Sequence, residues 1–253
     1  MSLSGLGDTG KAQPPPALFP APESDTPTPG RRRGGAPQNR PSQNRPSQNG
    51  SVQNGPPQTD DAGRQLVFFG ADAAEPTVAD LAGLLAGPGE VVRMGGTARL
   101  SVQVDAAWRV HVLVAELASR GLAASWEPTG GARHAVRTSY TRVLKPLAAA
   151  WLHGTTKRPP AAFHLTGRRL RLWLAAAGTP EPPDCFLLRL GADDHECWEP
   201  IGVALASAGM AGTLLGPAEG GPAYRIIGRR RLARLAELVG GPPNAAPVDA
   251  WPT

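Results

Sequence analysis

Residues 81–239 contain one pattern twice, and this duplication restricts the possible fold more than any other feature of the sequence. Leu-Ala-Gly-Leu-Leu-Ala-Gly-Pro-Gly at 81–89 is matched, at an offset of 89, by Leu-Arg-Leu-Trp-Leu-Ala-Ala-Ala-Gly at 170–178. Leu-Ala-Ser-Arg-Gly at 117–121 is matched, at an offset of 88, by Leu-Ala-Ser-Ala-Gly at 205–209. Matches in the same order indicate a duplicated unit of about 70 residues that packs against its copy.

Each copy is predicted to form an αββαββα unit, so the fold class is α+β. In the first copy, Thr77 followed by Asp80 is typical of a helix start, and the Gly-Pro-Gly at 87–89 ends that helix. The alternation of apolar and polar residues over 99–104 predicts a strand, and a Gly-Gly turn at 130–131 predicts a hairpin. The expected elements are helices 77–86, 105–117 and 141–152 with strands 99–104, 122–127 and 134–139 in the first copy, and helices 168–177, 194–208 and 229–239 with strands 186–190, 210–215 and 223–227 in the second.

The residues before the duplication predict a disordered tail. Proline is concentrated there and at the C-terminus, and Gln-Asn-Arg-Pro-Ser repeats at 38–42 and 43–47. Such a segment has too little apolar surface to offset the entropy lost on ordering. The expected organisation is a disordered low-complexity tail at 1–64, a first repeat at 65–160, a second repeat at 161–240 and a Pro-rich C-terminal tail at 241–253.

Charge and cysteine content limit the function classes. The formal charge of +5 favours an anionic partner, because a basic surface releases the counterions of a polyanion when it binds. The two cysteines, Cys185 and Cys197, are too few for a four-thiolate metal site. In Asp-Asp-His-Glu-Cys at 193–197 we expect a helix start, capped by Asp193 or Asp194, rather than metal ligands. We expect no metal and no cofactor.

The first nonapeptide and the element order resemble the LAGLIDADG family of homing endonucleases. The resemblance implies two motif helices that pack through small residues at a pseudo-twofold axis, with two sheets forming a saddle over DNA. Small residues suited to that repeat interface are Ala82, Gly83, Ala86, Ala175 and Ala176.

The same resemblance argues against catalysis. In the family, an acidic residue before the last Gly of each motif holds a divalent metal at the scissile phosphate, and these two positions are Pro88 and Ala177 here. Neither side chain binds Mg²⁺ or activates water. A displaced acid such as Glu90 or Glu181 is the alternative, and it requires two compatible displacements. We therefore expect a protein that is not an enzyme.

A catalytically inactive LAGLIDADG pair also resembles the N-terminal part of the WhiA family of bacterial regulators of sporulation and cell division. The spacing from Gly-Gly-Thr-Ala-Arg-Leu at 95–100 through Arg133 and Arg137 to the second motif carries this likeness, which extends over residues 75–240. A helix-turn-helix domain follows in WhiA. Here Gly-Gly-Pro-Pro at 240–243 follows the second repeat, so we expect that domain to be lacking.

If the saddle is retained, the polar faces of its strands are predicted to contact DNA. Arginine suits this role because its planar guanidinium donates two hydrogen bonds to a phosphate. The alternative is an ordinary solvated sheet face. The tryptophans Trp108, Trp126, Trp151, Trp173 and Trp198 lie among apolar residues and are expected in the core. The DNA-binding candidates are Arg99, Gln103, Arg133, Arg137, Ser139, Arg189 and Arg225 on strands, and Arg229, Arg230 and Arg231 at a helix start.

These observations predict a regulatory protein that binds double-stranded DNA and has no chemistry of its own. The alternative is an interaction module with the same fold that no longer binds DNA and acts on a regulator or a cell-division protein; an active endonuclease is a third reading. With no signal peptide or long apolar run, we expect a cytoplasmic protein without membrane contact, associated with the nucleoid if it binds DNA.

Overall fold

The computed structural model describes residues 75–252, and the predicted disordered tail at 1–64 lies outside them. The described residues form two four-stranded antiparallel sheets, whose strand orders are equivalent. The first sheet runs β1-β2-β4-β3 and the second runs β7-β8-β10-β9. A duplicated strand order with equivalent helices is what the repeated sequence predicts, so the fold is α+β with two tandem αββαββα repeats.

The first repeat begins with a short helical turn rather than a long helix. Turn η3 (Val78–Leu81) runs directly into α1 (Ala82–Ala86), and the Thr77 amide donates to the Asp80 carboxylate at 2.7 Å. The helix ends before Gly87, as the sequence predicts. The remaining elements are β1 (Glu90–Met94), β2 (Thr97–Val104), α2 (Ala107–Ala118), β3 (Ala124–Gly130), β4 (Arg133–Thr138), η4 (Arg142–Leu144) and α3 (Lys145–Trp151).

The second repeat follows a short connection that contains β5 (Leu152–His153) and β6 (Thr156–Lys157). It ends with η6 in the C-terminal segment. Its elements are α4 (Gly167–Ala177), β7 (Gly178–Glu181), β8 (Cys185–Arg189), α5 (His195–Ser207), β9 (Thr213–Leu215), η5 (Pro217–Glu219), β10 (Ala223–Ile227), α6 (Arg229–Val239) and η6 (Val248–Ala250).

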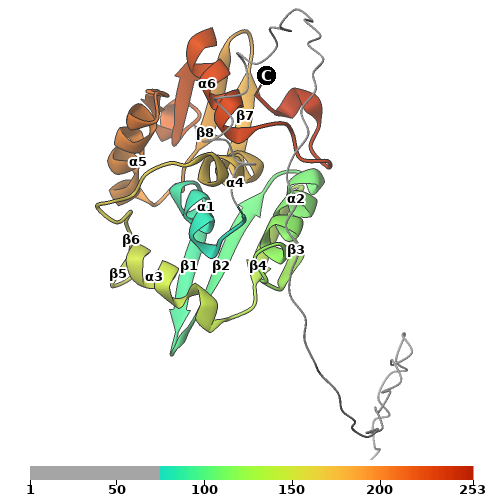
Figure 1. Ribbon diagram of the computed structural model, residues 1–253, viewed down its shortest axis with the longest axis vertical. Coiled ribbons are helices and arrows are strands. Elements are labelled where there is room, and N and C mark those ends of the chain that lie inside the picture. Colours follow the sequence, from blue (N-terminus) through green and yellow to red (C-terminus); the bar gives the residue numbers. More distant parts are fainter. Residues whose placement is uncertain (1–74, 253) are drawn as a thin grey trace, which may run out of the picture. The chain divides into compact units, whose positions relative to one another are not determined.

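Helices α1 and α4 lie side by side between the two sheets (Figure 1). Leu81, Leu84 and Leu85 of the first repeat and Leu170 and Trp173 of the second are fully buried in one continuous core. Burial on this scale is the main force that holds the repeats together, because each buried side chain of this size contributes roughly 1.5–3 kcal/mol. The core is therefore shared by both repeats.

The structure differs from the sequence prediction in the placement of one tryptophan and of several elements. Trp126 was expected in the core, but it is 53% exposed on the edge strand β3, with its ring edge against His134. The predicted helix at 141–152 is split into η4 and α3. Strands β1 and β7 were not located by residue. The adjacent Val91 and Val92 break the alternating pattern in β1, and β7 has four residues and contains Pro180.

The C-terminal segment, which the sequence identifies only as Pro-rich, packs back on the second repeat. Trp251 is buried and its indole N–H donates to the Gly240 carbonyl at 2.8 Å. The Arg171 guanidinium lies over the Trp251 ring and donates to the carbonyls of Val239 and Gly241. Residues beyond α6 thus take part in the packing of the motif helix α4.

Candidate nucleic-acid interface

A groove of about 610 Å³ lies where the two repeats meet, on the side of the sheets that faces away from the helices. Residues of both repeats line it, and the C-terminal ends of α1 and α4 reach its floor. The lining residues used below are Pro88, Glu90, Gln103, Asp105, Arg133, Arg137, Ala177, Arg189, Asp193 and Asp194.

Strand alternation places the polar side chains of the groove wall. In β2, Val102 and Val104 are buried against the helices, so Gln103 points the other way. The register pairs Ser101 with Arg137 of β4, which puts both on the groove side. The structure therefore brings four of the predicted residues to this groove: Gln103, Arg133, Arg137 and Arg189.

The arginines of the wall differ in how much of their charge is available to a ligand. Arg137 forms an ion pair with Glu127 on the neighbouring strand β3. Arg189 donates to the Gly220 carbonyl at 2.9 Å, and within residues 75–252 neither it nor Arg133 forms an ion pair. Arg133 and Arg189, one from each repeat, are thus the wall cations without a carboxylate partner in the described chain.

Two further strand arginines lie on the same faces but outside the groove. Arg99 of β2 has its guanidinium 4.9 Å from the centre of the Tyr140 ring, and its buried Nε has no hydrogen-bond partner in the described region. Arg225 of β10 is held by Glu181, with Nε–Oε2 at 2.9 Å and Nη2–Oε1 at 3.1 Å. Arg225 therefore carries less free charge than the sequence suggests.

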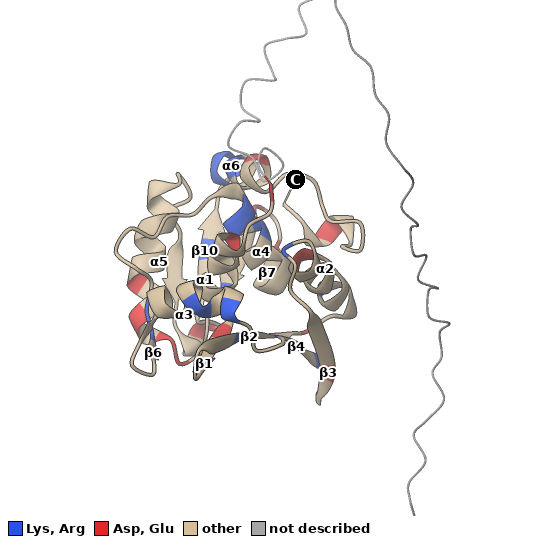
Figure 2. Ribbon diagram, turned by 60° about the horizontal axis from the view of Figure 1, so that its bottom comes forward, with Lys and Arg blue, Asp and Glu red and all other residues tan. Residues whose placement is uncertain are grey.

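The arginine run at 229–231 is not brought to the groove. It follows β10 at the end where Ile227 pairs with Cys185, whereas Arg189 pairs with Ala223 at the opposite end. Arg229 is exposed and lies 3.5 Å from Asp184. Figure 2 shows the basic start of α6 at the edge of the repeats, apart from β2 and β4. This cluster is a separate basic surface.

The floor of the groove is acidic, in contrast to its walls. Neither motif position supplies a carboxylate, since Pro88 and Ala177 line the floor. The acids that line the groove are Asp105, Asp193 and Asp194, together with Glu90, whose strand register places it beside Ser101 on the wall. Of the two acids considered as displaced ligands, Glu90 reaches the groove, whereas Glu181 is held by Arg225. No three His, Cys, Asp or Glu side chains gather as metal ligands anywhere in residues 75–252.

A buried arginine that sequence reasoning missed lies beneath this floor. Arg109 of α2, 5% exposed, donates to the carbonyls of Leu174 and Ala175 at 3.0 Å and of Gly178 at 2.6 Å. Asp105 accepts from its Nε at 2.9 Å. Desolvation by burial lowers the pKa of this guanidinium, and Asp105 acts in the opposite direction. The available signal was position, because Arg109 precedes the core residue Leu113 by one helical turn.

Lys157 binds the carbonyls at the end of α1, as Arg109 binds those at the end of α4. Its ammonium group donates to the carbonyls of Gly87 at 3.1 Å and Gly89 at 2.7 Å, and it lies 2.5 Å from the Asp194 carboxylate. Asp194 was expected to cap helix α5, but its side chain makes no capping hydrogen bond and pairs with Lys157 instead. No local sequence signal marks Lys157, because β6 is only two residues long.

The repeat interface is as tight as the small residues predict. Ala82, Ala86, Ala175 and Ala176 are at most 4% exposed. A Cβ atom at Gly83 would lie 1.9 Å from the Arg169 carbonyl oxygen of α4, so only glycine permits this approach.

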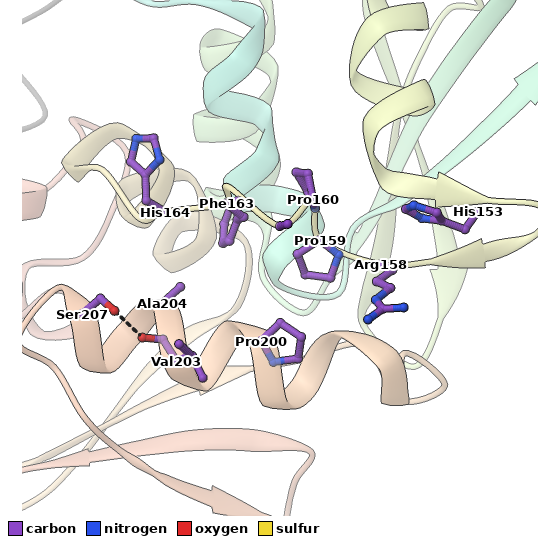
Figure 3. Close-up of a pocket in the computed structure, with 11 residues that line it drawn as sticks. His153, Arg158, Pro159, Pro160, Phe163, His164, Pro200, Val203, Ala204 and Ser207 are labelled. Carbon is purple, nitrogen blue, oxygen red and sulfur yellow. Dashed lines mark hydrogen bonds between the residues drawn. The ribbon is translucent and has the colours of Figure 1, made fainter.

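A second hollow of about 450 Å³ lies between the connection and α5. Figure 3 shows His153 and His164 at opposite ends of it, with Pro159 and Pro160 between them. The two imidazoles do not converge on one point, so the hollow offers no ligand pair.

No helix of residues 75–252 is long and apolar enough to cross a bilayer.

Comparison with known proteins gives likeness in structure only. No protein-family model and no curated protein matches the chain. Among solved structures, the homing endonuclease I-WcaI bound to its DNA recognition sequence has a TM-score of 0.47 at 11% identity, covering 63% of this chain and 78% of that one. I-DmoI in complex with DNA and Mn has a TM-score of 0.38 at 13% identity, covering 64% and 96%. The duplicated strand order described above is independent of these likenesses.

Proposed function

We propose that this chain is a DNA-binding protein without nuclease activity, and that it acts as a regulator of the WhiA type in transcription, sporulation or cell division. The groove between the repeats is the proposed DNA site. Association with the nucleoid in the cytoplasm is part of the same proposal.

The observation that carries the DNA proposal is that each repeat places an arginine without a carboxylate partner in the same groove. Arg133 comes from the first repeat and Arg189 from the second, and Gln103 lines the groove with them. Guanidinium groups in this arrangement suit phosphates on a duplex, because phosphate contacts position a protein on DNA.

Absence of nuclease activity is supported by the chemistry of the floor. Metal-assisted hydrolysis needs oxygen ligands for a hard divalent cation beside the scissile phosphate. Pro88 and Ala177 offer none, and the carbonyls of the residues that follow them, Gly89 and Gly178, already accept from Lys157 and Arg109. We expect supercoiled plasmid DNA incubated with the full chain and Mg²⁺ or Mn²⁺ to remain uncut.

A second candidate function is the interaction module that acts on a regulator or a division protein. Two observations favour it: Arg137 and Arg225 are already paired with Glu127 and Glu181, and four acids line the groove. Both features weaken attraction to a polyanion. DNA binding by the full chain discriminates between the two functions.

The test is a fluorescence-anisotropy titration of a labelled duplex with the full chain at several salt concentrations. Binding should weaken steeply with salt, and Arg133→Ala should lower both the affinity and the salt slope, the latter by about 1, as loss of one phosphate contact requires. Arg142→Ala is the matched control, because Arg142 is exposed and does not line the groove. No binding at low salt would reject the DNA proposal and favour a protein partner.

A further inference from the structure

A buried cation lies at the C-terminal end of each of the helices α1 and α4, and the two cations bind backbone carbonyls in the same way. Arg109, from the first repeat, donates to the carbonyls of Ala175 and Gly178, which flank position 177 of the second. Lys157, from the connection, donates to the carbonyls of Gly87 and Gly89, which flank position 88. Both motif positions are therefore bracketed by oxygens that already bind a cation.

Each cation also has its own carboxylate at the groove floor. Asp105 lies two residues before α2 and pairs with Arg109, and Asp194 lies directly before α5 and pairs with Lys157. The side chains of Arg109 and Lys157 are 6% exposed, whereas those of Asp105 and Asp194 are 65% and 21% exposed. The cations lie beneath the floor and the acids line it.

This donor set does not fit a divalent metal. The C-terminal end of a helix carries partial negative charge on its unpaired carbonyls, which attracts a cation. A hard metal ion needs several such oxygens together with carboxylates, but these are occupied by N–H donors that are themselves positively charged. A metal ion entering here would lose its ligands and would be repelled by Arg109 or Lys157.

We propose that Arg109 and Lys157 are built-in cations that take the place of divalent metal at the centre of the groove, so that a carboxylate restored at position 88 or 177 pairs with the cation and binds no metal. This deepens the proposed non-catalytic function, but it concerns metal binding alone and does not depend on DNA binding. Lys157 and Arg109 are positioning residues for the helix ends.

The experiment removes the built-in cation from the full chain and measures whether Mn²⁺ binds in its place. Pro88→Asp adds a carboxylate between the two residues whose carbonyls accept from Lys157, and Pro88→Asp/Lys157→Met also frees those carbonyls and Asp194 from that cation. Mn²⁺ binding is followed by electron paramagnetic resonance and by thermal unfolding. We expect no bound Mn²⁺ in Pro88→Asp. In the double variant we expect about one Mn²⁺ per chain, with a rise in Tm of about 5–10 °C when free Mn²⁺ is about 100 times the Kd.

Two results overturn the proposal: Mn²⁺ binding by Pro88→Asp with Lys157 intact, or a folded double variant that binds none. If the double variant does not fold, Ala177→Asp and Ala177→Asp/Arg109→Met are compared by the same criteria. If that pair also fails to fold, Pro88→Asp decides, since bound Mn²⁺ there rejects the proposal and its absence supports it. DNA titrations are not involved, so failure here is distinguishable from failure of the DNA proposal.

Discussion

At the residue scale, single atoms set the distance between the two motif helices. Gly83 contacts the backbone of α4, and Gly87 faces the Trp173 ring, where an added Cβ would lie 2.5 Å from Cδ1. Backbone on the facing helix cannot move as a flexible side chain can. Glycine at these positions is therefore a packing requirement rather than a turn requirement.

Gly83→Ala should lower the free energy of unfolding by about 3 kcal/mol, because the methyl group forces α1 away from α4. Gly96→Ala is the matched control, since a Cβ there meets nothing within 4 Å, and it should change stability by less than about 0.5 kcal/mol. Urea denaturation of both variants measures the difference. Equal stabilities would show that the helices are not held at this contact.

Cys197 gives a second residue-scale prediction, in alkaline solution. Desolvation raises the pKa of its thiol from about 9 to about 11, so the folded protein holds the proton more tightly than the unfolded chain. The resulting stabilisation is complete below pH 9 and is lost as the pH rises to 11; it amounts to about 3 kcal/mol. We expect the unfolding free energy of Cys197→Ser to fall less steeply than that of the wild type over this interval. Parallel curves would contradict the raised pKa.

At the scale of elements, a buried arginine connects the end of α2 to the start of the first motif helix. Arg120 donates to the Thr77 carbonyl at 2.9 Å and pairs with Asp80 at 3.3 Å and Glu116 at 2.6 Å. Its side chain is 1% exposed. The short η3–α1 helix thus depends on an element about 40 residues away, since a segment this short is not stable alone.

Arg120→Met should destabilise the protein by about 3–5 kcal/mol, because it leaves Asp80 without its ion-pair partner and Glu116 with only Arg171 at 3.9 Å. Arg142→Met removes an exposed arginine and should cost less than about 0.5 kcal/mol. Thermal and chemical unfolding check both values. A double-mutant cycle with Asp80→Asn should show a coupling well above zero, and additivity would show that the pair contributes nothing.

The elements themselves were largely predictable from sequence. Helix α6 and strand β10 fall at the predicted residues, and α4 and α5 begin or end within a residue of them, because their periodicities are strong. The β5–β6 hairpin was missed because its strands are too short to show a period, and β1 was missed because the adjacent Val91 and Val92 break the alternation of apolar and polar residues. Trp126 was misplaced because local apolar neighbours do not reveal that β3 is an edge strand.

For the whole molecule, the shared core predicts that neither repeat is an independent folding unit. Leu81 and Leu85, at the start of α1 and within it, and Leu170 and Trp173 in α4 are fully buried in one cluster. Separating the repeats would expose this surface to water, at about 25 cal/mol per Å².

We therefore expect the full chain to unfold in a single transition and a fragment of residues 75–160 to remain unfolded. Calorimetry of the full chain and amide-proton NMR of the fragment are the measurements. Adding residues 161–252 in trans should restore dispersed signals, which serves as the control. A fragment that gives a dispersed spectrum alone would contradict the prediction.

The sequence by itself determined the duplication, the αββαββα order, the small residues between α1 and α4 and the residues without carboxylates at positions 88 and 177, because each is a local or periodic pattern. Tertiary structure alone decided the electrostatics of the groove. The hydrogen bonds of Arg109 and Lys157 to the motif helices join residues 65 to 70 positions apart. The ion-pair partners of Arg137 and Arg225 lie on other strands of the same sheets, so they depend on the order of the strands in each sheet. Such long-range contacts leave no periodic signal, so only the folded chain shows which charges face a ligand and which hold the protein together.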